Sequence, residues 1–182
     1  MMNALSKLTG KTISSATEVI LQGFTGSADS SMTGNLIKVS TVYSISEGTV
    51  LDVSRDTDNL YVVTVQYSPT DLFRYCRLSS VNVSTNSYVI PTDEIGVTVD
   101  GKLRFEYCTN ESSLYPVRIA NNTYYKQDPS PILMDSRTLY MSQTALGEFF
   151  TKNVNKYTSN IVKTSSIPSG LSSILGGTYG NN

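Results

Sequence analysis

Alternation of apolar and polar side chains is the strongest pattern in this chain, and it predicts β-strands. In residues 60–67, Tyr61, Val63, Val65 and Tyr67 share one face of an extended chain, and the residues between them share the other. Shorter segments of the same kind, separated by Gly, Pro, Asp and Asn, predict further strands at residues 42–54, 72–78, 88–90, 95–99 and 103–108. We therefore predict a mainly β domain that begins near Leu36.

The first 35 residues lack this alternation and are predicted to form an N-terminal arm, residues 1–35. The segment Ser15-Ala16-Thr17-Glu18 has the form of a capping box, and with Gly23 as a stop it indicates a short helix near 16–22. The composition of residues 26–34 predicts a loop. A terminus without fixed structure is the open alternative, because so few apolar groups do not offset the entropy of ordering the chain.

The pattern changes again after Asp135, where apolar residues recur at helical spacings. They predict an amphipathic helix of about 24 residues, which packs either on its own domain or on another subunit. Residues 164–182 form a low-complexity tail rich in Ser, Gly and Asn. The predicted division is therefore an arm at 1–35, a β domain at 36–134, and a helix with tail at 135–182.

Both predicted terminal segments carry more apolar side chains than a purely solvating tail needs. Segments of this kind become ordered on a partner surface, where burial of their apolar groups offsets the entropy cost. We therefore expect partner contacts at eight residues: Val19, Ile20, Leu21, Phe24, Ile167, Leu171, Ile174 and Leu175.

The chain contains no histidine, and this excludes several kinds of site. Histidine is the commonest metal ligand and the side chain that titrates near neutral pH. Without it the chain has no Ser-His-Asp triad, no Cys-His pair and no His-x-His metal site. Two cysteines are also too few for a four-ligand structural zinc site. We expect no metal and no other cofactor.

The net charge and the hydropathy of the chain limit the classes of partner that it is expected to bind. The net charge of -1 offers no electrostatic basis for binding nucleic acid. No apolar run approaches the roughly 18 residues of a membrane-spanning helix. The first residues lack the basic and apolar regions of a secretory signal, so we expect synthesis in a cytoplasm.

Two motifs in the middle of the chain resemble the M23, lysostaphin-like zinc endopeptidases. Residues 73–80 read FRYCRLSS, and residues 100–107 read DGKLRFEY, with Val81, Val83, Ile95 and Gly96 between them. The family reads approximately Tyr-x-His-Leu-Ser, then Val-x-x-Gly, Ile-Gly and His-Leu-His-Phe-Glu. Residues 42–50, and the segments 115–117 and 124–133 with their prolines, also resemble the family's first and closing strands. The resemblance covers about residues 36–134 and implies an antiparallel β-sheet domain.

The same resemblance implies that the family's chemistry is lost. The histidine positions of the motifs hold Arg77, Lys102 and Arg104 here, and residues 34–41 contain no counterpart of the family's upstream zinc-binding Asp. An arginine has no lone pair to offer a metal and stays protonated. We therefore expect a protein that is not an enzyme.

Three interpretations of Arg77, Lys102 and Arg104 stay open. The favoured one is a surface ion-pair cluster with Glu106 and Asp93 or Glu94, each pair contributing little stability. In the second, the cations form a groove for carboxylate or phosphate, which arginine binds well. In the third, the groove takes the acidic segment of a neighbouring chain.

Strand parity argues against a disulfide between Cys76 and Cys108. Cys76 is offset by one residue from Arg77 and Cys108 by four from Arg104, so the two thiols are expected on opposite faces of the sheet. A cytoplasmic origin agrees with free thiols.

The missing secretory signal, the composition rich in Ser, Thr, Asn and Tyr, and the two terminal segments resemble those of a phage virion component. Inactive domains that resemble M23 peptidases occur in phage particles and in wall-associated complexes. We expect a virion component of a tailed phage, in the tail or baseplate, that is made in the host cytoplasm and contacts other structural subunits. The alternative is a module that binds peptidoglycan without cutting it.

Overall fold

The computed structural model describes residues 3–24 and 33–134, and its strands form one 11-stranded antiparallel sheet system. The strands with their bounds are β1 (Ile20–Gln22), β2 (Asn35–Lys38), β3 (Thr41–Tyr43), β4 (Gly48–Arg55), β5 (Tyr61–Gln66), β6 (Asp71–Val81), β7 (Tyr88–Val89), β8 (Glu94–Thr98), β9 (Lys102–Thr109), β10 (Pro116–Ile119) and β11 (Asn122–Gln127). The helices are α1 (Ala4–Thr9), the 3-10 turn η1 (Ala16–Glu18) and α2 (Ser130–Leu133).

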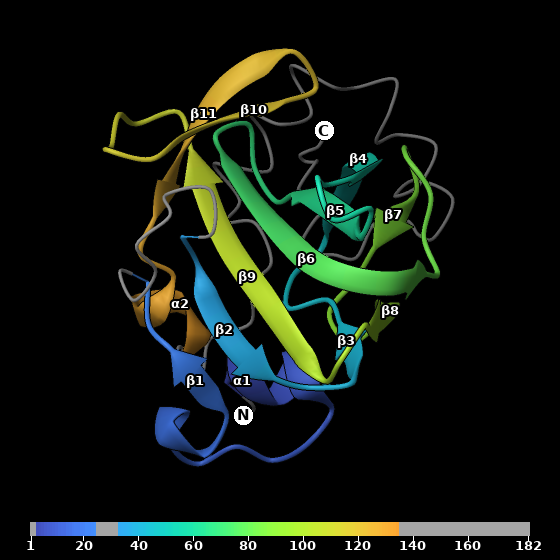
Figure 1. Ribbon diagram of the computed structural model, residues 1–182, viewed down its shortest axis with the longest axis vertical. Helices are drawn as coiled ribbons and strands as arrows, with labels where there is room; N and C mark the ends of the chain where they lie inside the picture. The colour runs from blue at the N-terminus through green and yellow to red at the C-terminus, as the bar shows by residue number, and fades with distance from the viewer. Residues whose placement is uncertain (1–2, 25–32, 135–182) are drawn as a thin grey trace, which may run out of the picture. The chain divides into compact units, whose positions relative to one another are not determined.

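The sheet runs in the order β1-β2-β9-β6-β5-β4-β7, and β6 and β9 lie side by side in its middle (Figure 1). Off this path, β10 pairs with β11, β11 with β9, and β8 with β3 and β6. The predicted mainly β antiparallel fold is thus confirmed. No helix in the part of the chain that the structure describes is long and apolar enough to cross a membrane.

The main core lies on one face of β6 and β9. Phe73, Tyr75 and Phe105 are at most 1% exposed, and the rings of Phe73 and Phe105 stack with centroids 5.8 Å apart. Tyr75 also accepts a hydrogen bond from the Ile45 backbone N–H at 3.1 Å, so its buried hydroxyl has a partner. Because every second side chain of β6 and β9 faces this core, apolar and polar residues alternate along both strands.

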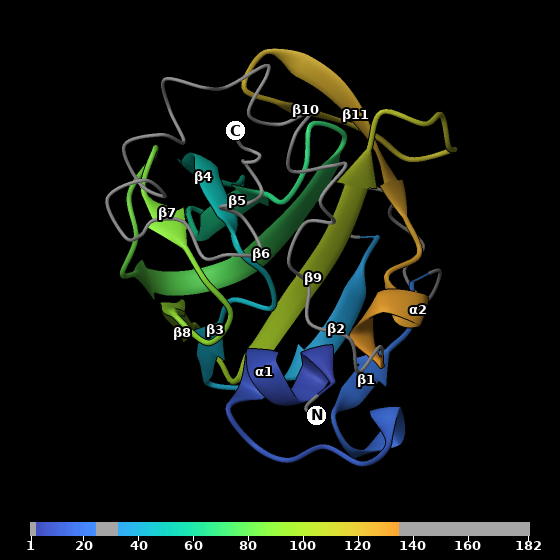
Figure 2. The ribbon, with the colours of Figure 1, turned by 180° about the vertical axis from the view of Figure 1, so that it is seen from behind.

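The N-terminal segment belongs to this core, which corrects the predicted arm. Ala4, Leu5 and Leu8 of α1 are fully buried, and Ile13 and Val19 are at most 9% exposed. Figure 2 shows α1 against one end of β9 and β2. The domain boundary predicted at residue 35 therefore cuts through the hydrophobic core.

The short helix expected near 16–22 is also shorter than predicted. The Glu18 carboxylate accepts the Ser15 backbone N–H at 3.1 Å, as a capping box requires, but the helical turn ends at Glu18. The chain then extends into β1, which pairs with β2. The β-branched pair Val19 and Ile20 favours this strand. The pairing of β1 with β2 is a tertiary contact that local sequence does not reveal.

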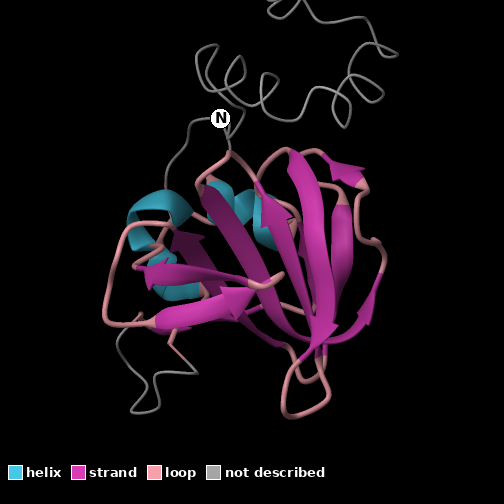
Figure 3. Cartoon of the chain, turned by 90° about the horizontal axis from the view of Figure 1, so that it is seen from above, coloured by secondary structure: helices cyan, strands magenta, loops and turns pink. Residues whose placement is uncertain are grey.

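The β10–β11 hairpin stands over the second face of the sheet, where Leu72, Cys108 and Ile119 form a smaller buried cluster (Figure 3). The closing strand predicted at 124–133 ends at Gln127, and Ser130–Leu133 forms the helix α2 instead. Pro129 and Pro131 lack the N–H groups that a strand ladder needs, so the strand stops there. The helix predicted after Asp135 and the tail at 164–182 lie outside the described residues.

Candidate functional site

The two family-like motifs form neighbouring strands, β6 and β9, whose register sets the site. Arg74 lies opposite Glu106, and Cys76 opposite Arg104. Residues that lie opposite each other in an antiparallel pair project from the same face. These four side chains therefore point away from the aromatic core, toward the face that the β10–β11 hairpin partly covers.

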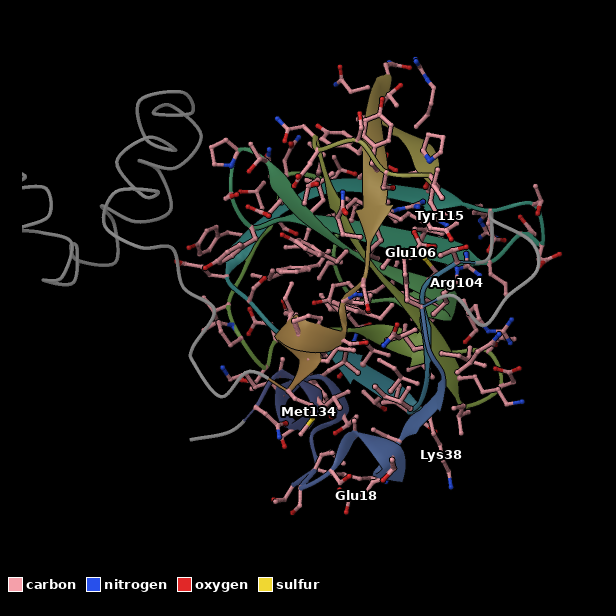
Figure 4. All side chains as sticks on the ribbon, turned by 90° about the vertical axis from the view of Figure 1, so that its left-hand side faces the viewer. Glu18, Lys38, Arg104, Glu106, Tyr115 and Met134 are labelled. Carbon is pink, nitrogen blue, oxygen red and sulfur yellow. The ribbon has the colours of Figure 1, made fainter. Side chains whose placement is uncertain are left out.

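Glu106 is the centre of this face. Its carboxylate is 1% exposed and accepts Arg74 Nη1 at 2.6 Å, Arg104 Nε at 2.9 Å and Lys126 Nζ at 3.1 Å. Figure 4 shows the Arg104 and Glu106 side chains beside each other. The Lys126 ammonium also donates to the Thr33 carbonyl at 3.1 Å, which ties β11 to the start of β2. Three strands and the segment before β2 are thus joined through one buried carboxylate.

The three cations keep Glu106 ionised in spite of its burial. Burial alone would raise the pKa of this carboxyl, because it penalises the charged form. Arg74, Lys126 and Arg104 outweigh that effect, and the net pKa of Glu106 is lowered. At neutral pH the site therefore holds an ionised carboxylate that contacts three basic side chains.

Arg77 occupies an irregular position in the middle of β6. Its φ is +71°, a left-handed conformation that non-glycine residues rarely adopt. At this bulge β6 leaves β9 and pairs with β8 from Leu78 onward. The bulge turns the guanidinium toward the β9 start, where Nη2 donates to Asp100 Oδ2 at 2.5 Å and Nε to the Lys102 carbonyl at 3.2 Å.

A cavity of about 260 Å³ opens between these strands, and we call it the basic pocket. Arg77, Lys102 and Arg104 line it together with the single acidic residue Asp100. The remaining lining residues are Gln22, Gly34 and Leu36. The ion pair with Arg77, whose hydrogen bond is the largest influence, lowers the pKa of Asp100. The pocket therefore combines three cations with one ionised carboxylate.

The structure brings together the three residues singled out from the sequence, and it corrects their partners. Arg104 pairs with Glu106, as expected, but this pair is buried and not on the surface. Arg77 pairs with Asp100 rather than with Asp93 or Glu94. Asp93 instead accepts the Ile90 backbone N–H at 2.9 Å, and Glu94 accepts Asn82 Nδ2 at 2.5 Å.

Arg74 and Lys126 are site residues that the sequence reasoning missed. Arg74 alternates with the aromatic residues Phe73 and Tyr75, so its position on the face of Glu106 follows from strand parity. Nothing in the local sequence of β11 indicates that Lys126 reaches Glu106, because that contact depends on the register of β11 against β9.

The residues of the basic pocket do not fit a zinc ion. Guanidinium and ammonium groups have no lone pair for a metal, and their positive charge repels a divalent cation. Within residues 3–24 and 33–134, no group of three or more His, Cys, Asp and Glu side chains is arranged to hold a metal ion. No step through a bound metal is therefore derived for this site.

The two thiols lie on one face of the sheet, contrary to the parity argument. Cys76 is opposite Arg104 and Cys108 is opposite Leu72, and both thiols are free and buried. The bulge at Arg77 shifts the alternation by one residue, so Arg77 and Cys76 no longer point to opposite faces. The two thiols are therefore free although they share a face, and the predicted placement on opposite faces was wrong.

The residues predicted to contact partners differ in exposure. Val19 is buried in the chain's own core and is not available to a partner, which corrects that assignment. Leu21 is 50% exposed on the edge strand β1. The ring of Phe24 packs edge-on against that of Tyr115, with the ring centroids 5.2 Å apart. Ile20 is partly buried against the core. Ile167, Leu171, Ile174 and Leu175 lie outside the described residues.

No protein-family profile matches the chain, and no curated protein sequence is similar to it. Its fold is similar to that of several solved structures. The antimicrobial peptidase lysostaphin from Staphylococcus simulans has a TM-score of 0.49 and 18% identity, over 77% of this chain and 57% of that one. Csd3 from Helicobacter pylori has a TM-score of 0.48 and 14% identity, over 81% and 43% of the two chains. LytU has a TM-score of 0.47 and 18% identity, over 62% and 81%.

Proposed function

We propose that this chain is a non-catalytic structural component of a phage tail or baseplate type of assembly, built on an inactivated M23-like peptidase domain. One observation carries the proposal. The three positions where the resembled family has zinc-binding and catalytic histidines hold Arg77, Lys102 and Arg104, and these residues lie around one pocket. Two of the three are bound to carboxylates, Arg77 to Asp100 and Arg104 to Glu106.

The network around Glu106 supports a structural role for the former site. A hydrolytic centre needs a group that accepts a proton or activates a water, with a pKa near the working pH. Arg74, Arg104 and Lys126 instead surround a carboxylate whose pKa is lowered, so it stays a weak base. Contacts of this kind join β6, β9 and β11 and hold the sheet together.

Loss of zinc chemistry is tested by metal analysis and by an activity assay on the purified full chain. The proposal expects well below one zinc per chain after dialysis against a zinc buffer, and no cleavage of peptidoglycan cross-bridges. About one tightly bound zinc per chain, or release of cross-bridge fragments above the level of a buffer control, would contradict it.

Assembly is tested separately, on the terminal segments. The exposed Leu21 and the apolar residues at 164–182 are the proposed contacts with other structural subunits. A chain without residues 164–182 should keep a cooperative unfolding transition and lose incorporation into its particle. Normal incorporation of that truncated chain would remove the tail from the proposal.

A non-hydrolytic peptidoglycan-binding module is the second candidate, and the basic pocket at the positions of the resembled family's active site supports it. Purified sacculi distinguish the two functions. Co-sedimentation of the full chain with sacculi, with saturation at increasing protein concentration, supports the wall-binding function. Recovery in the supernatant, together with co-elution with structural subunits on size exclusion, supports the assembly function.

A further inference from the structure

We propose that the basic pocket is a binding site for a single carboxylate of a partner polypeptide, namely the side chain of an Asp or Glu residue. The inference goes beyond the proposed function, because it assigns a ligand to the pocket whether or not the chain is part of a virion. The pocket residues that bear on it are Arg77, Asp100, Lys102 and Arg104.

Asp100 shows which chemistry the pocket favours. Its carboxylate accepts Arg77 Nη2 at 2.5 Å and the Lys102 backbone N–H at 3.2 Å. The Asp100 side chain is 45% exposed and that of Arg77 is 19% exposed. Ion pairs of such exposure contribute little free energy. An incoming carboxylate therefore exchanges with Asp100 on the Arg77 guanidinium at little cost.

Lys102 supplies a second cationic contact at the pocket. Its side chain is exposed, and no carboxylate among the described residues forms an ion pair with its ammonium group. A carboxylate placed between Arg77 and Lys102 would gain two charge-assisted hydrogen bonds, which are the stronger kind. Arg104 adds positive potential from the pocket wall while it keeps its bond to Glu106.

The backbone at Arg77 holds its guanidinium ready for this contact. The φ of +71° at the bulge directs the Arg77 side chain toward Asp100. The Nε bond to the Lys102 carbonyl at 3.2 Å fixes the guanidinium further. Binding therefore needs little ordering of this side chain, and the loss of conformational entropy is small.

The size of the pocket and its two cationic contacts suit a single carboxylate. Its volume of about 260 Å³ is below the roughly 300–1,000 Å³ of sites that enclose whole small molecules. An acidic side chain fits within such a space. Arg77 and Lys102 offer two cationic contacts, which match the two oxygen atoms of one carboxylate.

The test uses the full chain and two short blocked peptides that differ in one residue, Ser-Gly-Asp-Gly-Ser and Ser-Gly-Asn-Gly-Ser. Their shapes are nearly equal, and only the first has a carboxylate. Each peptide carries the same fluorescent label, and its anisotropy is measured as the protein is added. The Asp peptide should show saturable binding, and the Asn peptide should bind about tenfold more weakly. Equal binding of the two peptides would overturn the proposal.

Three variants locate the site. Lys102→Ala should weaken binding of the Asp peptide about tenfold, since it removes one charge-assisted contact. Lys38→Ala is the matched control, because Lys38 is the cross-strand neighbour of Lys102 on β2 but does not line the basic pocket. Asp100→Asn should tighten binding several-fold, because it removes the competing charge. Unchanged binding in Lys102→Ala or Asp100→Asn would exclude this pocket.

A competition experiment distinguishes the source of the anion. Acetate should displace the Asp peptide at lower concentration than inorganic phosphate does, at equal ionic strength. Displacement by phosphate at the lower concentration would show that the pocket is a phosphate site, and the proposal of an acidic polypeptide would be wrong.

Discussion

Lys126 and Glu106 form an ion pair across β11 and β9, with Nζ and Oε2 3.1 Å apart and side chains only 4% and 1% exposed. Glu106 therefore neutralises cations that come from three strands. Replacement of Glu106 by alanine would leave Arg74, Arg104 and Lys126 without this counter-charge in a buried setting. Removal of one partner of a buried pair typically costs about 3–5 kcal/mol of the free energy of unfolding. We expect a loss of that size, measured by urea denaturation.

Glu111→Ala is the control for this experiment. Glu111 lies close to Glu106 in sequence but is exposed, so its replacement should change the free energy of unfolding by less than about 0.5 kcal/mol. Equal effects of the two replacements would mean that the buried network does not stabilise the fold.

The ionisation of Glu106 also predicts how stability depends on pH. Its pKa is lowered in the folded state, so the contribution of the charged carboxylate is fully present above its ordinary value of 4.5. The contribution is lost as the pH falls through the lower folded pKa. The difference in free energy of unfolding between wild type and Glu106→Gln should therefore be constant from pH 7 to pH 5. It should shrink progressively below about pH 4.5.

This pH prediction is checked by urea denaturation of both proteins at matched ionic strength. Other acidic groups titrate in both proteins and cancel in the difference, Asp100 included. A difference that grows with acidity would mean that Glu106 is protonated in the native state near neutral pH.

The strands were predictable because apolar and polar residues alternate along them, and the apolar residues mark the buried face directly. In β6 and β9, Phe73, Tyr75 and Phe105 mark the core side, and the charged residues between them mark the other. Strand β5 is less simple, since Val62, Val63, Thr64 and Val65 are all buried, so neither of its faces is exposed there. The alternation identified the strand but did not show its double burial.

An ion pair was predictable only where the alternation of side chains along one strand places both residues on the same face. Arg104 and Glu106 are two positions apart on one strand, so their contact follows from the sequence. The Arg77–Asp100 pair depends on a bulge with a positive φ, which no residue pattern indicates in this strand. The contact of Lys126 depends on the register of a distant hairpin. Contacts of this kind are properties of the tertiary structure.

The buried thiols give an independent check of the sheet around the pocket. Burial, with a smaller contribution from Glu106, raises the pKa of Cys76 to about 11 and that of Cys108 to about 12. Since the thiolate is the reactive form, both residues should react very slowly with Ellman's reagent at pH 8 in the native protein. In denaturant, both cysteines of the chain should react fully. Rapid reaction of either thiol without denaturant would mean that this face opens readily.

Helix α1 supplies the most direct test of the corrected domain boundary. Leu8 is fully buried in the same cluster as Leu103 and Phe105, although its helix has only six residues. A helix of that length is not stable alone, so its order depends on packing against the sheet. Leu8→Ala should therefore destabilise the protein by about 2–5 kcal/mol, because the substitution leaves a cavity in the core.

The matched control is Leu114→Ala, since Leu114 is 85% exposed and its truncation leaves no cavity. It should change the free energy of unfolding by less than about 0.5 kcal/mol. For the same physical reason a fragment of residues 36–134 should lack a cooperative thermal transition, while a fragment of residues 1–134 should retain one, as measured by circular dichroism. Cooperative unfolding of the 36–134 fragment at the wild-type midpoint would restore the boundary at residue 35 and make α1 a dispensable addition to the core.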